Sequence, residues 1–448
     1  MIPFDLNMEE VLENWEPFHA IREIIANALD EQLMSDSNEI EISECSDKQG
    51  WHIRDYGRGV QIEHFTQNEN PEKYGGPKGI IGKFGVGLKD ALATFHRNGI
   101  IPIIKSPYGT YTIAIHAKEG FADIETLHVM FDDTPNEMNG TDFFLKGATS
   151  QQIEQAKDLF LKFTTSREIE TTKYGSILAS GNEDSANRVY INGVLASEEE
   201  NFLFSYNITN LTPGMRKALN RERTNVGRTT YSERVKSILK FAKSDEVLGE
   251  LADQIELRYT GEQCDEITWS EIAQVGIQAL AVLDDQAIFV TENEMLHNPD
   301  EMERMRMEGR NIIVSNERDR GKIECDDATT FVDYVIDFQE SFEFKFVDRG
   351  QLSAKEKKVF DKTQSIMEMV GWTEDNMPEI LISETLQKET DSSSGLLVTF
   401  SAIGLYQPGL NRITILRNQL ISLESYAGTL LHEAAHAASG ASDATRRF

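Results

Sequence analysis

Three short stretches near the amino end place carboxylates, an asparagine and glycines in an order that constrains the fold more than any other feature. They are Glu23–Asp30, Asp55–Gly59 and Gly82–Gly87. Each stretch alone is common in unrelated proteins. Their occurrence in this order within residues 23–87 predicts that they build one site, for a ligand that is charged at one end and flat at the other.

The first stretch is predicted to be a helix with Glu23, Asn27 and Asp30 on one face, because successive residues turn by about 100°. Isoleucines fill much of the remaining surface and indicate that the helix is largely buried. A buried polar stripe requires a partner, and a Mg²⁺–triphosphate is a suitable one. The Asn27 oxygen can then ligate the metal, while Glu23 polarises an attacking water as general base. An ordinary amphipathic helix with a solvated polar stripe is the alternative.

The second stretch follows a strand-like run, Trp51–Arg54. Asp55 at the strand end, with Gly57 and Gly59 behind it, suits close approach of the backbone to a flat ligand. Asp55 would accept a hydrogen bond from an adenine amino group. A plain Asp-x-Gly turn is the alternative for this stretch alone.

The third stretch is a glycine-rich loop that runs into a predicted helix. Glycines let backbone amides converge on phosphate oxygens at a helix N-terminus. The pattern is not a P-loop, because Gly-Lys-Ser/Thr is missing. It also lacks the short preceding strand of a Rossmann motif. Its residues are Gly82, Lys83, Phe84, Gly85, Val86 and Gly87.

Together these stretches resemble the GHKL ATPases, the superfamily of DNA gyrase, the large heat-shock chaperones, MutL and sensor histidine kinases. A fourth family element, a threonine after glycine on a late strand, matches Gly140–Leu145. The resemblance implies ATP and Mg²⁺ as cofactors, Glu23 as general base, Asn27 as Mg²⁺ ligand, and Asp55 with Thr141 as adenine readers. It makes Gln61–Ile81 the mobile lid and Gly82–Gly87 its phosphate end. Further residues expected to contact the nucleotide are Asp30, Gly57 and Gly59.

A basic cluster in Leu219–Asn225 resembles the transducer domain of these ATPases, which carries a cation to the γ-phosphate. Arg221 is the expected residue and Arg223 the alternative. A solvated helix end is the competing interpretation of the same cluster.

The carboxy end contains His432, Glu433 and His436 in an HExxH pattern. Two histidines four residues apart on a helix can face one Zn²⁺, with the glutamate as base toward bound water. With the strand-like run Arg412–Leu416, this resembles zincin metallopeptidases, whose edge strand pairs with substrate. The usual third histidine is missing, so Asp443 is the predicted third ligand, with upstream carboxylates left open. A buried helix with two satisfied histidines is the alternative.

Composition limits which partners and which cellular location can be expected for the chain. The chain has 448 residues, 40% of them hydrophobic, and a formal net charge of −31. This acidity disfavours nucleic acid as a partner, because phosphate backbones require clustered cations. Three widely spaced cysteines indicate reduced thiols, and neither a signal peptide nor a bilayer-spanning run is recognisable. A cytoplasmic location without membrane contact is therefore expected.

The predicted architecture is α/β (α+β) in four domains. Residues 1–160 are a GHKL-type ATP-binding sandwich, 161–245 a transducer-like domain, 246–345 a small α/β unit with a parallel strand pair, and 346–448 a zincin-like domain. These expectations describe an ATPase, homodimeric through its ATPase domain, that acts as a switch controlling a fused zinc-peptidase-like effector. Bacterial stress response or antiviral defence is a role by analogy alone. The alternative is a chaperone-like or scaffold ATPase whose carboxy-terminal domain binds a partner protein without proteolysis.

Overall fold

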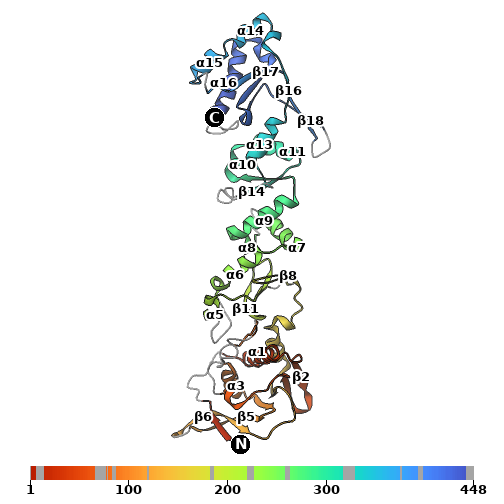
Figure 1. The fold of residues 1–448 in the computed structure, drawn as a ribbon, viewed down its shortest axis with the longest axis vertical. Coiled ribbons are helices and arrows are strands. Elements are labelled where there is room, and N and C mark those ends of the chain that lie inside the picture. The colour runs from red at the N-terminus through yellow and green to blue at the C-terminus, as the bar shows by residue number, and fades with distance from the viewer. Residues whose placement is uncertain are drawn as a thin grey trace. The chain divides into compact units, whose positions relative to one another are not determined.

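The computed structural model describes residues 2–6, 15–65, 77, 79–82, 87–118, 121–181, 186–218, 227–257, 263–315, 328–373, 376–391 and 397–439. The chain separates into two compact units, residues 1–244 and 245–448. Both are mixtures of helices and sheets, so the predicted mixed α/β class is confirmed (Figure 1). The four-domain division remains a prediction.

The amino-terminal part of the first unit is built on a seven-stranded sheet in which all neighbouring strands are antiparallel, in the order β1-β6-β5-β4-β7-β3-β2. Its strands are β1 (Ile2–Asp5), β2 (Glu41–Cys45), β3 (Gly50–Arg54), β4 (Ile101–Ser106), β5 (Gly109–Lys118), β6 (Phe121–Asp132) and β7 (Asp142–Lys146). The sequence pattern predicts two alternating strands over residues 39–55 and strand-like runs at 111–116, 124–131 and 141–146, and strands are present at each of these places. The structure adds β1 and β4, which the sequence analysis missed.

Three helices pack together beside this sheet: α1 (Pro17–Ser35), α3 (Gly87–Arg97) and α4 (Ser150–Asp158). Helix α1 lies at the centre, since it contacts α3, α4 and β3. Ile21, Ile24 and Ile25 are at most 1% exposed and join one core with Phe95 of α3 and Leu145 of β7. The predicted burial of this helix is therefore confirmed.

The sequence pattern predicts a helix over residues 9–34, of which residues 9–14 lie outside the described part of the chain. Helix α1 begins at Pro17, where Glu16 and His19 form a capping box around a proline in the first turn. It ends where Asp36 takes a left-handed conformation, with φ of 48°.

The remainder of the first unit is a five-stranded sheet in the order β11-β10-β12-β9-β8, with helix α6 packed against β9 and β12. Its elements are β8 (Glu168–Thr172), β9 (Gly175–Leu178), β10 (Asn187–Ile191), β11 (Val194–Glu199), β12 (Ser205–Ile208), α5 (Pro213–Ala218) and α6 (Arg228–Lys240). The sequence pattern predicts two strands and two helices over residues 188–245, where the structure has the three strands β10, β11 and β12. It also predicts a solvated loop at 198–200, which is wrong because Glu198 and Glu199 are the last residues of β11. Glu198 pairs there with Arg188 and Glu199 with Arg228.

The second unit begins with a helical segment and a three-stranded parallel sheet in the order β14-β13-β15. Its elements are α7 (Asp245–Leu257), α8 (Asp265–Thr268), α9 (Ser270–Leu283), β13 (Ala287–Thr291), α10 (Glu292–His297), α11 (Pro299–Met307), β14 (Asn311–Ser315), β15 (Thr329–Thr330) and α13 (Phe331–Glu340). The predicted parallel pair is present as β13 and β14. Gly309 follows α11 with φ of 75°, the left-handed conformation that glycine commonly adopts just after the end of a helix.

The carboxy-terminal part is a sheet in the order β16-β17-β20-β19, with β18 paired to β17. Its elements are β16 (Glu343–Phe346), α14 (Ala354–Phe360), α15 (Thr363–Met369), β17 (Glu379–Asp391), β18 (Leu397–Ser401), β19 (Gly404–Gln407), β20 (Arg412–Leu416) and α16 (Leu423–Ser439). The sequence analysis took Arg412–Leu416 for an edge strand. That was wrong, because β20 pairs with both β17 and β19, and the strands at the two ends of this order are β16 and β19.

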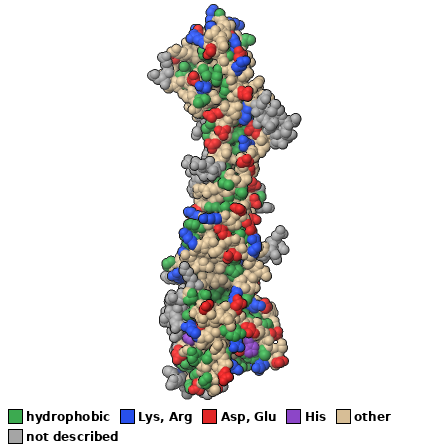
Figure 2. All heavy atoms as spheres, turned by 45° about the vertical axis from the view of Figure 1, so that its right-hand side comes forward, with side chains coloured by type: hydrophobic (Ala, Val, Ile, Leu, Met, Phe, Trp, Pro, Cys, Tyr) green, Lys and Arg blue, Asp and Glu red, His purple; other side chains and the backbone are tan. Residues whose placement is uncertain are grey.

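The described surface carries acidic side chains scattered among Lys and Arg, in keeping with the net charge of −31 (Figure 2). Among the described residues, none of the helices combines the length and the apolar character that crossing a bilayer requires.

Candidate functional site

The predicted polar stripe of helix α1 lies largely inside the protein. Glu23 and Asp30 are 3% and 1% exposed, and Asn27 between them is half-buried. A buried carboxylate is costly unless charged or hydrogen-bonding groups face it. Each of the two carboxylates has such partners, and the partners differ.

Glu23 forms an ion pair with the residue before it. The Nη2 of Arg22 lies 3.1 Å from Oε1 of Glu23, and Arg22 is itself only 1% exposed. The other oxygen faces the start of α3, because a Cβ added to Gly87 would lie 2.2 Å from Oε2 of Glu23. A larger residue at this position would have to displace the Glu23 carboxylate, so Gly87 lets the N-terminus of α3 lie beside the predicted general base.

Asp30 holds the backbone just before the glycine-rich stretch. Its Oδ1 accepts the N–H of Ile81 at 2.6 Å, and its Oδ2 accepts the N–H of Gly82 at 2.7 Å. Bonds from amides to a charged carboxylate are stronger than those between neutral groups. In this structure Asp30 therefore anchors the segment from which a phosphate loop would extend.

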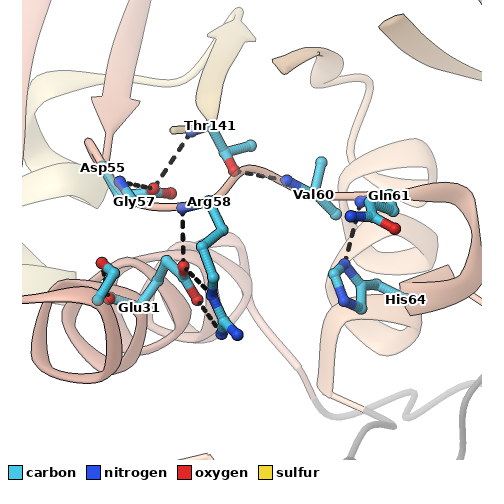
Figure 3. Close-up of polar contacts among 9 residues, drawn as sticks. Glu31, Asp55, Gly57, Arg58, Val60, Gln61, His64 and Thr141 are labelled. Carbon is cyan, nitrogen blue, oxygen red and sulfur yellow. Dashed lines mark hydrogen bonds and ion pairs between the residues drawn. The ribbon is translucent and has the colours of Figure 1, made fainter. Parts of the chain in front are cut away.

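Asp55 and Thr141 lie side by side at the ends of β3 and β7 (Figure 3). The Oδ1 of Asp55 accepts the N–H of Gly57 at 3.0 Å and that of Thr141 at 3.2 Å. The backbone N–H of Asp55 donates in return to the carbonyl of Thr141 at 2.9 Å. Oγ1 of Thr141 accepts the N–H of Val60 at 3.0 Å. The two predicted adenine readers, far apart in sequence, thus share one hydrogen-bond network.

The Asp55 carboxyl has a pKa well above that of an ordinary aspartate. It is 5% exposed, and this burial raises its pKa from 3.8 to about 6, against the opposing effect of the N–H donors of Gly57 and Thr141. Both backbone amides donate to Oδ1, and the Thr141 side chain is a further hydrogen-bond partner of the carboxyl that lowers its pKa. At neutral pH the group is mainly ionised and can accept a bond from a ligand.

Two glycines allow the backbone to close around this pair. Gly140 has φ of 75°, and a Cβ there would lie 2.0 Å from the carbonyl oxygen of Asp55. Gly59 has φ of 89°, and its Cβ would lie 2.6 Å from Pro107. Both positions combine a left-handed backbone with a close contact, so both require glycine.

The sequence analysis missed a further contact that fixes the Asp55–Gly59 turn on α1. Arg58 donates to Glu31 through its backbone N–H at 2.8 Å, through Nε at 2.9 Å and through Nη2 at 2.9 Å (Figure 3). Gly57 is needed here too, because a Cβ would lie 2.6 Å from Oε1 of Glu31. The available signal was an acidic residue directly after the first predicted motif and a basic residue within the second.

Several predicted residues lie outside the described part of the chain. They include four residues of the glycine-rich stretch, most of the predicted lid, the predicted γ-phosphate cation and the predicted third zinc ligand. These positions are Lys83, Phe84, Gly85, Val86, residues 66–76 and 78, Arg221 with its alternative Arg223, and Asp443.

The HExxH residues lie on α16 beside the edge strand β19. The Nε2 atoms of His432 and His436 are 3.2 Å apart. Glu433 is 7% exposed and faces β19, since a Cβ on Gly404 would lie 2.8 Å from its Oε1. Over the described residues, three or more His, Cys, Asp or Glu side chains do not come together as a metal site. The two histidines therefore form at most a pair of ligands within this part of the chain.

Two comparisons with known sequences place the chain in a family. The family model for the Mycoplasma pneumoniae MPN635 N-terminal domain matches residues 151–245. An uncharacterized protein of Mycoplasma pneumoniae (strain ATCC 29342 / M129 / Subtype 1) is 38% identical over 240 residues, which are 53% of this chain and 96% of that protein. The chain belongs to the family of that mycoplasmal protein.

Among solved structures, the ATPase region of Saccharomyces cerevisiae topoisomerase II matches with 11% identity and a TM-score of 0.24. The ATPase and transducer domains of Balamuthia mandrillaris topoisomerase II match with 10% identity and a TM-score of 0.26. Both matches cover 40% of this chain, which spans about three fifths of the length of either structure (62% and 59%). Likeness at this level establishes neither fold nor activity by itself.

Proposed function

We propose that residues 1–160 bind ATP with Mg²⁺ and hydrolyse it in the manner of a GHKL ATPase. The observation that carries this proposal is the Asp55–Thr141 network. In this network two backbone amides donate to Oδ1 of a buried carboxylate, and we expect its other oxygen, Oδ2, to accept from the ligand. An amino group on a flat heterocycle, such as that of adenine, is the partner such an oxygen accepts from.

The phosphate end of the nucleotide would lie toward Asn27, Glu23 and the N-terminus of α3. Mg²⁺ is commonly held by one or two protein oxygens together with substrate phosphates, and the half-buried Asn27 carboxamide supplies such an oxygen. Bound Mg²⁺ would neutralise charge on the phosphates. Glu23, fixed by Arg22 and adjacent to Gly87, would take the proton from the attacking water.

The same proposal extends to a conformational switch. Arg221 would supply a cation to the γ-phosphate, and paired amino-terminal domains would close and reopen with each hydrolysis cycle. These two elements rest on the sequence resemblance.

Nucleotide selectivity tests the proposal. Guanine carries a carbonyl oxygen where adenine carries its amino group, so the Asp55 carboxylate would repel guanine and accept from adenine. We expect ATP to bind at least ~10-fold more tightly than GTP, with Mg²⁺-dependent hydrolysis of ATP. Calorimetric titration and a phosphate-release assay measure both. Equal affinity for the two nucleotides would contradict the assignment of Asp55.

A zinc-peptidase activity for the carboxy-terminal part is a separate proposal, favoured by the His432–His436 pair beside the edge strand β19. Those histidines would hold Zn²⁺ with Asp443, and Glu433 would act as base toward bound water. Elemental analysis of the purified protein and of His432→Ala with His436→Ala tests it. Equal zinc content in both would favour the alternative, an ATPase whose carboxy-terminal part binds a partner protein.

A further inference from the structure

A short backbone segment, Ile80–Gly82, is held from two sides. From helix α1, Asp30 accepts the amides of Ile81 and Gly82. From the second sheet of the same unit, Nδ2 of Asn192 donates to the carbonyl of Ile80 at 3.1 Å. Ile80 is 2% exposed, so its carbonyl bond is made inside the protein. The two residues before the glycine-rich stretch and its first residue, Gly82, are thus bonded from two different parts of the unit.

Asn192 reaches this segment because it lies at the tip of a tight hairpin. Asn192 and Gly193 connect β10 to β11 and have φ of 49° and 77°. Two successive positive φ values are typical of the Asn-Gly hairpin turn that matches strand twist. Two further hydrogen bonds hold the turn in place. The N–H of Asn192 donates to the carbonyl of Ile208, and the N–H of Gly193 donates to Oδ1 of Asn207.

The hairpin is also joined firmly to the amino-terminal part. The carbonyl of Gly193 accepts the N–H of Leu161 at 2.9 Å, and Val194 forms a bridge with Phe160. Val194 is 6% exposed and belongs to the same core as α1. Because its base is fixed in this way, the hairpin presents the Asn192 amide to Ile80 with little freedom.

We propose that Asn192 is a positioning residue through which the nucleotide site is coupled to the sheet of residues 168–208. This deepens the proposed function and rests on it. A nucleotide bound against α1 and the N-terminus of α3 would act on the Ile80–Gly82 segment, which Asp30 of α1 holds. Any shift of the Ile80 carbonyl then changes its bond to the hairpin. Coupling of this kind is reciprocal, so the hairpin contact in turn favours the nucleotide-bound arrangement of the segment.

Two substitutions isolate the contact without disturbing the turn. Asn192→Gly keeps the left-handed backbone and removes the amide. Asn192→Asp keeps the shape but replaces the donor with an oxygen that repels the Ile80 carbonyl. Asn411→Gly is the matched control, since Asn411 has φ of 45° in the other compact unit.

The test is hydrogen exchange of the full-length protein, with and without a non-hydrolysable ATP analogue, together with analogue affinity. We expect amides of residues 79–82 to exchange roughly 2- to 10-fold faster in both Asn192 variants, as loss of one hydrogen bond implies. Analogue-induced protection of residues 193–195 should be present in the wild type and in Asn411→Gly, and absent from both Asn192 variants.

The outcomes separate the two proposals. Analogue binding by the wild type, with exchange and affinity unchanged in both Asn192 variants, would overturn the coupling role alone. A wild type that does not bind the analogue would overturn the proposed function and the coupling role together.

Discussion

Arg22 and Glu23 are neighbours in sequence and form an ion pair in the interior, with Nη2 and Oε1 3.1 Å apart and both side chains at most 3% exposed. Removing one partner of a buried pair leaves the other charge uncompensated, which costs more than the intact pair contributes. The pair therefore matters for folding as well as for the position of the predicted general base.

Arg22→Met should lower the free energy of unfolding by about 3–5 kcal/mol, because the Glu23 carboxylate then stays buried without its cation. Adding Glu23→Gln should recover part of this loss, giving a coupling energy of at least ~1 kcal/mol in a double-mutant cycle. Urea denaturation of the four proteins measures it. Strictly additive effects would show that the two side chains do not interact.

Glu23→Gln alone should nearly abolish ATP hydrolysis while leaving ATP affinity close to that of the wild type. The substitution removes the base but keeps the side chain's shape and leaves the Asp55 contacts intact. Steady-state turnover and calorimetric titration, run on the same preparation, separate the two effects. If affinity fell in parallel with turnover, the general-base role would be wrong.

Asp55→Asn should weaken ATP binding at neutral pH by roughly 1.5–3 kcal/mol, as expected for a lost charge-assisted hydrogen bond. Because the pKa of Asp55 is raised to about 6 by burial, this difference should shrink as pH falls through that value. The ionisation of ATP affects the affinities of variant and wild type equally, so the difference between them at each pH does not depend on it. An affinity that Asp55→Asn leaves unchanged between pH 5 and 8 would remove Asp55 from the pocket.

The same carboxyl predicts the sign of a stability effect. Its folded-state pKa of about 6 lies above the ordinary 3.8, so the native state binds this proton more tightly than the unfolded chain. The free energy of unfolding should therefore decline as pH rises from about 4 to about 6, relative to Asp55→Asn. Thermal unfolding across that range tests it, and a relative gain in stability with rising pH would contradict the sign.

Gly140→Ala should destabilise the protein more than Gly99→Ala. Both glycines have positive φ, which costs alanine roughly 1–2 kcal/mol. Only at Gly140 does the added Cβ also meet a backbone atom, the Asp55 carbonyl oxygen at 2.0 Å, whereas Gly99 has open space. Denaturant unfolding should show the larger loss at Gly140, with weakened ATP binding in that variant alone. Equal losses would mean that the Asp55 turn tolerates displacement.

Much of the fold around the site could be predicted because local pattern and tertiary packing agree there. Alternating strands β2 and β3 and the isoleucine-rich α1 are examples. Strand β4 was missed because Pro102 argues against a strand, yet β4 pairs with both β5 and β7. The edge role given to β20 failed because sequence order alone does not reveal which strand lies outermost.

The candidate site was predicted as a set of residue types, and the structure adds their partners. Asp55 and Thr141 meet because β3 and β7 are neighbours, a pairing between residues far apart in sequence. The anchoring of Ile81 and Gly82 by Asp30, and of Ile80 by Asn192, could not be read from the sequence. These bonds involve backbone groups, which leave no trace in residue identity.

The most direct test of the central claim is a crystal structure of the protein with a non-hydrolysable ATP analogue and Mg²⁺. We expect the adenine amino nitrogen within about 2.7–3.2 Å of Oδ2 of Asp55, and the phosphates beside Asn27 and the N-terminus of α3. Density for the base at any other place, or none at saturating analogue, would contradict the account.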